Sequence, residues 1–153
     1  MNLDPSAFVA DPSLVQALEK QAVPIPCAED RVLFSQGDDP VGLYVLKSGQ
    51  VTLTMKSPAG KELVTIQAAD GSLLGLPGLI GNEPYTLSAI AHAGAELNFV
   101  TRDTFADLMR TDPMLALKVL QVLAAEVRSA RNAMLQRSVS KPRRSRLTAP
   151  RRA

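Results

Sequence analysis

The chain has 153 residues, of which 46% are hydrophobic and 21% are charged, a composition typical of one globular domain. No apolar run reaches the roughly 18 residues that would span a bilayer, and the acidic start, Met1–Pro5, does not resemble a signal peptide. The single cysteine, Cys27, excludes an intrachain disulfide. We therefore expect a cytoplasmic protein without a membrane segment.

Charge is divided unevenly along the chain. From Arg137 onward there are seven basic residues and no acid, whereas the rest of the chain carries ten basic residues against all 15 acids, a net charge of −5. Residues 138–153 have no apolar period, and we expect a disordered basic tail there. Such a tail offers weak phosphate contacts to nucleic acid, but it has no aromatic residue to stack on bases.

Short strands dominate the first two thirds of the chain. A helix comes first, with Asp11 as its cap and Pro12 at its first position, and it ends before Pro24. Short strand-like segments follow, separated by turns that contain glycine or proline. They are residues 31–35, 42–47, 50–56, 62–67, 88–93 and 96–100. This pattern predicts an all-β sandwich, jelly roll or barrel over residues 1–111.

The segment Gly71–Ala89 interrupts these strands. It holds four of the nine glycines and two prolines, with apolar residues between them. We expect a loop whose bare backbone can approach a ligand closely.

Two helices complete the pattern. The first covers residues 101–110, with Thr101 as its cap, and the second covers residues 112–137, with Asp112 as its cap. Apolar residues recur along the long helix at intervals of 4, 3, 4, 3 and 4, which is a heptad stripe. The stripe consists of Ala116, Leu120, Leu123, Val127, Ala130 and Met134. It either packs on the β-roll of its own chain or pairs with its copy in a homodimer.

In this order, the elements resemble the cyclic-nucleotide-binding domain of Crp/Fnr-type bacterial regulators over residues 14–135. Val32–Asp38 matches the family's strand that leads into Gly-Asp, and Leu43–Val51 matches its hairpin with a glycine at the turn. The resemblance implies a mainly β fold with flanking helices: a double-stranded β-helix (jelly roll) and a long C-terminal helix through which these regulators dimerise. Their DNA-reading helix-turn-helix follows that helix. We expect none here, because only about fifteen residues remain.

The segment Gly71–Ala89 resembles, by its spacing, the phosphate-binding cassette of that family. The matching positions are Gly71, Gly75, Asn82 and Pro84. The family's glutamate, which accepts a hydrogen bond from the ribose hydroxyl, falls on Leu76, and its phosphate-pairing arginine falls on Tyr85. The small alanine that follows falls on Leu87, and the threonine falls on Ser88.

These departures bear on ligand binding. A buried phosphate needs a paired cation or several charge-assisted hydrogen bonds, each worth about 1.5–3 kcal/mol. We therefore expect a degenerate pocket that does not bind cyclic AMP or cyclic GMP at micromolar concentration. Either apolar side chains of the segment fill the space, or the pocket is retuned for a more apolar ligand with Tyr85 and Ser88 as its polar points. Retained nucleotide binding is the third alternative.

The sequence gives no argument for an enzyme. It contains no recognisable nucleophile–base pair, and the lone His92 and Cys27 do not make a zinc site, so we expect no cofactor or metal. The prediction is a non-enzymatic regulatory or sensor module. The alternatives are a functional sensor of a cyclic nucleotide or another small molecule, and a transcription-associated regulator that acts through dimerisation or its basic tail.

Overall fold

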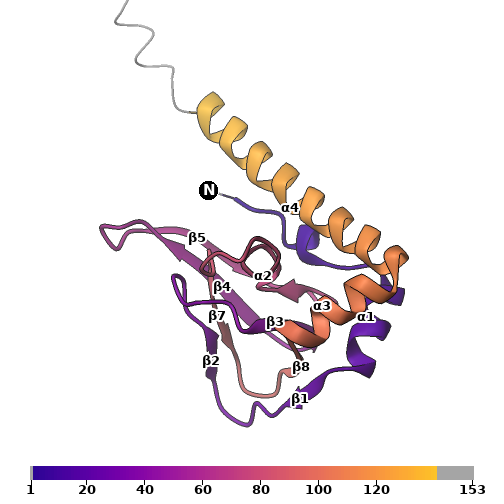
Figure 1. The fold of residues 1–153 in the computed structure, drawn as a ribbon. Helices are drawn as coiled ribbons and strands as arrows, with labels where there is room; N and C mark the ends of the chain where they lie inside the picture. The colour runs from indigo at the N-terminus through magenta and orange to yellow at the C-terminus, as the bar shows by residue number, and fades with distance from the viewer. Residues whose placement is uncertain (1, 141–153) are drawn as a thin grey trace, which may run out of the picture.

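The computed structural model describes residues 2–140, with side chains described for residues 2–136. Two four-stranded antiparallel sheets form its centre (Figure 1), with strand orders β1-β8-β3-β6 and β2-β7-β4-β5. The strands are β1 (Val23–Ile25), β2 (Arg31–Phe34), β3 (Gly42–Ser48), β4 (Val51–Lys56), β5 (Glu62–Gln67), β6 (Leu73–Leu74), β7 (Ser88–Ala91) and β8 (Glu96–Thr101). The predicted jelly roll with flanking helices is confirmed.

Helices cover one side and one end of this β-roll. They are η1 (Pro5–Phe8), α1 (Pro12–Lys20), α2 (Leu76–Gly81), α3 (Arg102–Thr111) and α4 (Pro113–Ser140). The three predicted caps are confirmed, because Asp11, Thr101 and Asp112 each accept a hydrogen bond from a backbone N–H two or three residues further on. The long helix ends three residues later than expected, and the rest of the predicted basic tail lies outside the described residues.

Four short elements were not predicted: η1, β1, β6 and α2. The residues around Pro24 form β1, which pairs only with β8; an edge strand tolerates a proline because one side of it makes no ladder. The segment Gly71–Ala89 is not a loop throughout, since it contains the two-residue strand β6 and the one-and-a-half-turn helix α2. Elements this short carry too few residues for a periodic pattern.

The core has two parts. The first lies between the two sheets and includes Phe34, Leu53, Leu74, Tyr85 and Leu97. The second lies between the β1-β8-β3-β6 sheet and helices α1, α3 and α4, and includes Leu14, Leu43, Leu76, Phe105 and Val119. Figure 1 shows α4 running past α2 and the N-terminal segment, and Leu115, Val119 and Val122 of this helix belong to the second part. Within residues 2–140, no helix is both long and apolar enough to cross a membrane.

Candidate ligand pocket beneath the long helix

The cassette backbone comes close to the ring of Tyr85. Gly75 precedes α2 with φ +93°, a left-handed conformation that favours glycine. A Cβ atom on Gly75 would lie 2.8 Å from Cε1 of Tyr85. Glycine at this position therefore lets the start of α2 pack directly against the aromatic ring of Tyr85.

Tyr85 is a core residue rather than a free binding group. Its side chain is 3% exposed, and its ring stacks on Phe34 with centroids 4.2 Å apart. The hydroxyl donates a hydrogen bond to the carbonyl oxygen of Gly42 at 2.8 Å and accepts one from the backbone N–H of Val41 at 3.1 Å. Its polar end is thus used to fix the start of β3.

A small cavity remains between α2, the β-roll and α4. Its volume is about 20 Å³, enough for about one water molecule, whereas pockets for small organic ligands measure about 300–1,000 Å³. Apolar side chains make up most of its wall: Phe8, Phe34, Leu53, Leu74, Tyr85 and Leu87. The space expected for a ligand is largely occupied by the protein's own side chains.

The predicted site residues are only partly brought together. Gly75, Tyr85 and Leu87 line this cavity, and Pro84 is exposed at the start of the same loop. Leu76 is fully buried, but it packs in the second core part instead of the cavity. Ser88 begins β7 and lines a groove on the β2-β7-β4-β5 sheet. Its Oγ accepts a hydrogen bond from the backbone N–H of Gln36 at 2.8 Å.

One site residue was missed by the sequence analysis. Glu126 of α4 reaches the cavity and is the one carboxylate among the described residues that line it. Its Oε2 atom is buried and makes no hydrogen bond with any group in the described part of the chain. Burial, with no neighbouring charge to offset it, raises the pKa of Glu126 to about 8.

The sequence signal for Glu126 is a second heptad stripe on α4, the inner stripe. Each of its members precedes a member of the predicted stripe by one residue. Its other members are apolar or small and mostly buried: Leu115, Val119, Val122, Ser129 and Ala133. Glu126 fills the missing heptad position between Val122 and Ser129. A lone acid in such a stripe indicates a buried carboxyl, but the sequence has two candidate stripes and does not say which one faces the β-roll.

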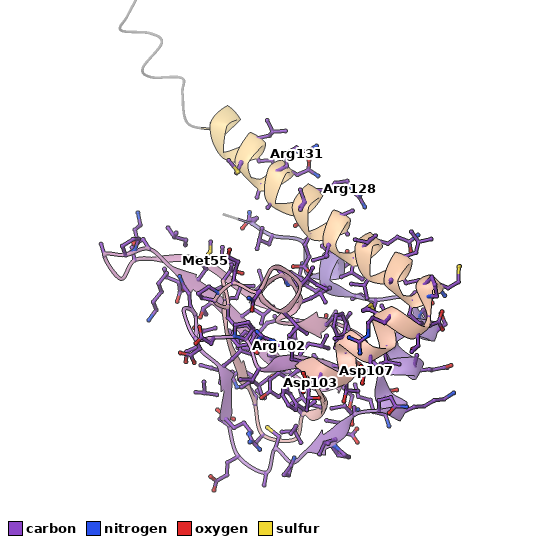
Figure 2. The ribbon with its side chains drawn as sticks, in the orientation of Figure 1. Met55, Arg102, Asp103, Asp107, Arg128 and Arg131 are labelled. Atoms are coloured by element: carbon purple, nitrogen blue, oxygen red, sulfur yellow. The ribbon has the colours of Figure 1, made fainter. Side chains whose placement is uncertain are left out.

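The predicted heptad stripe faces outward. Leu120, Val127 and Met134 are 58%, 58% and 60% exposed. Figure 2 shows Arg128 and Arg131 extending from the side of α4 that faces away from the sheets. These three large side chains therefore have no cover from the described part of their own chain, whereas Leu123 of the same stripe is partly buried against the second core part.

The residues considered for metal binding do not form a site. Cys27 is buried, with its thiol directed at the carbonyl oxygens of Glu29 and His92. His92 contacts Thr52 and Asp30 on the sheet surface. Among residues 2–136, no three histidine, cysteine or acidic side chains gather closely enough to hold a metal ion.

More than half of the chain matches a known protein family. The sequence profile of the family described as "Cyclic nucleotide-binding domain" matches residues 25–112. The chain belongs to the cyclic nucleotide-binding domain family. The match covers most of the β-roll, the cassette and α3, whereas Phe8 and Glu126 of the cavity wall lie outside it.

Relatives within the family are regulators. The chain is 25% identical over 80% of its length to the "CRP-like cAMP-activated global transcriptional regulator" of Mycobacterium tuberculosis, and 29% identical over 67% of its length to the "Cyclic AMP receptor protein" of Thermus thermophilus. It spans about half the length of these relatives, 54% and 47%. The crystal structure of the Thermus thermophilus catabolite activator protein is similar with a TM-score of 0.72, at 25% identity, over 88% of this chain and 63% of that one.

Proposed function

We propose that this protein is a non-enzymatic regulatory module of the cyclic nucleotide-binding family that does not bind cyclic AMP or cyclic GMP at micromolar concentration. The observation that carries the proposal is the position of Tyr85. It stands where the family resemblance places a phosphate-pairing arginine, and its buried ring and hydroxyl are committed to Phe34 and the start of β3. A phosphate in this space would have no cation to pair with.

One further feature of the cavity disfavours an anion. Pro77 occupies the first turn of α2 and has no backbone N–H, which removes one of the donors that a helix start offers to a phosphate. This feature weakens phosphate binding beyond the loss of the arginine.

Isothermal titration calorimetry tests this proposal. The protein is titrated with cyclic AMP and with cyclic GMP, and the Thermus thermophilus cyclic AMP receptor protein is titrated in the same buffer to compare the two. We expect no binding heat from this protein up to about 100 μM nucleotide, because the loss of several charge-assisted hydrogen bonds costs several kcal/mol. A micromolar or tighter Kd for either nucleotide would overturn the proposal.

We further propose that the module acts as a homodimer through the outer stripe of α4, which is the predicted heptad stripe. This proposal is supported by the exposure of Leu120, Val127 and Met134 at heptad spacing, since an apolar seam of this kind is typical of paired helices. Arg128 and Arg131 then flank the seam, where charged side chains are usual. A homodimer would place the two β-rolls on opposite sides of a helix pair.

The relatives suggest where such a dimer works. One relative is named a cAMP-activated global transcriptional regulator, and the other is named a cyclic AMP receptor protein. We propose that the module works in the cytoplasm, in the control of transcription. It acts there by pairing with its own copy or with a regulator of the same family.

A further inference from the structure

Glu126 lies in a place where a charged group is hard to accommodate. It belongs to the inner stripe of α4, between Val122 and Ser129, and it points into the apolar cavity of the β-roll. An ionised carboxylate in such surroundings is costly unless a cation or several donors compensate it. The buried Oε2 atom has no such partner among the described side chains.

No neighbouring titratable or charged group pairs with Glu126. Among the described residues that line the cavity, the one other titratable side chain is Tyr85, which bonds to Gly42 and Val41. On α4, Lys118 pairs with Asp11 at 3.2 Å. Asp4, before η1, and Arg128 line a separate groove between the N-terminal segment and α4. None of these groups is in a position to neutralise the carboxylate.

Contacts on both sides of Glu126 hold α4 on the β-roll. Towards the N-terminal end of the helix, Lys118 pairs with Asp11 of the α1 cap, and Val119 packs in the second core part. Towards the C-terminal end, the backbone N–H of Asp4 donates to Oγ of Ser129 at 2.7 Å. Glu126 therefore sits under the middle of the helix, where its protonation state can decide how well the helix packs.

We propose that Glu126 is a proton-operated latch for α4. When neutral, the carboxyl lies in the cavity and lets the helix pack on the β-roll; when ionised, it is driven toward solvent and loosens the central turns of the helix. This inference goes beyond the proposed function and is independent of it, because neither nucleotide binding nor dimerisation uses the proton. Failure of one leaves the other standing.

The direction of the pH effect follows from proton linkage. The folded-state pKa of Glu126, about 8, lies above the ordinary value of 4.5, so the packed state binds a proton that the opened state releases. Packing is therefore strongest at acidic pH and weakens as the pH rises from about 5 to about 8, after which it levels off. In this window the population of the opened helix grows by up to tenfold per pH unit.

The stabilising contribution of the Asp11 contacts depends on pH in the opposite direction and over a different pH range. Its hydrogen bonds with Ser13 and Lys118 lower the pKa of Asp11 to about 2. That contribution is present above the ordinary pKa of 3.8 and is lost only as the pH falls toward 2. Titration of Asp11 therefore does not contribute between pH 5 and pH 9, where the effect of Glu126 is expected.

Two measurements on the full chain test the latch. Carbon-13 NMR of the glutamate carboxyls, with Glu126 assigned from the signal missing in Glu126→Gln, should give a midpoint above pH 7. Amide hydrogen exchange, corrected for its intrinsic pH dependence, should show the central turns of α4 opening at least tenfold more at pH 8 than at pH 6. The Glu126→Gln variant should show no such rise, because the amide side chain stays neutral.

Controls separate the latch from a general pH effect. Glu29→Gln removes an exposed carboxylate in the connection between β1 and β2, which lies at the end of the β-roll away from α4 (Figure 1), and the variant should behave like the unmodified protein. If Glu126→Gln does not fold, Glu126→Met supplies a neutral side chain of similar size. A midpoint of Glu126 near 4–5, or a parallel rise of opening in the unmodified protein and the neutral variant, would overturn the proposal.

Discussion

At the scale of single residues, Tyr85 does structural work at a position where the family resemblance places a binding group. Its hydroxyl links the loop after α2 to the start of β3 through Gly42 and Val41. Its own backbone N–H and carbonyl bond to Asp38 and Gly37 in the turn after β2. One side chain and its peptide groups thus tie three segments of the β-roll together.

Removal of this hydroxyl should weaken the fold. We expect Tyr85→Phe to lower the free energy of unfolding by about 1–2 kcal/mol, because the buried carbonyl of Gly42 and the partly buried N–H of Val41 lose their partner. Tyr44→Phe is the matched control, since its hydroxyl makes a single, longer bond of 3.3 Å to Leu33 in a half-buried site. It should cost less than about 1 kcal/mol. Urea unfolding measures both, and equal losses would contradict the role given to Tyr85.

The sequence showed which positions depart from the family pattern, but it did not show where their side chains point. The exchanges at Leu76 and Tyr85 were visible in the sequence, and both side chains are buried, as in the alternative in which the segment fills its own pocket. The sequence did not show that Leu76 turns into the second core part while Tyr85 enters the cavity. These directions depend on how α2 is placed on the β-roll, which is decided by tertiary packing rather than by local pattern.

At the scale of elements, α4 carries two apolar stripes on adjacent faces. Leu115, Val119 and Val122 face the β-roll, and Leu120, Val127 and Met134 face outward. The heptad spacing of the outer stripe was recognised from the sequence, but spacing does not tell which stripe packs inside. The caps and most strands followed from local signals, whereas β1, β6 and α2 were too short to leave one.

Matched substitutions should separate the two faces. Val122 is 4% exposed and Val127 is 58% exposed. We expect Val122→Glu to lower the free energy of unfolding by at least about 3 kcal/mol, because it buries an unpaired charge. Val127→Glu should change the stability of the single chain by less than about 0.5 kcal/mol. Urea unfolding at low protein concentration measures both, and a large loss for Val127→Glu would place the outer stripe inside.

At the scale of the whole molecule, a nearly filled cavity is combined with an apolar helix face that the described residues leave exposed. The cavity of about 20 Å³ leaves no room for a nucleotide in this conformation, while the outer stripe of α4 presents large apolar side chains to solvent. If the module regulates through pairing, its association should not respond to cyclic nucleotides. The family fold is then retained for its dimerisation surface rather than for its best-known ligand.

Sedimentation velocity of the unmodified protein, with and without 1 mM cyclic AMP or cyclic GMP, tests this claim most directly. We expect a homodimer with the same dissociation constant in all three conditions, and a monomer for Val127→Glu, which places a charge in the seam. A monomeric unmodified protein would contradict the account. So would a dissociation constant that shifts with nucleotide, or a Val127→Glu variant that remains a dimer.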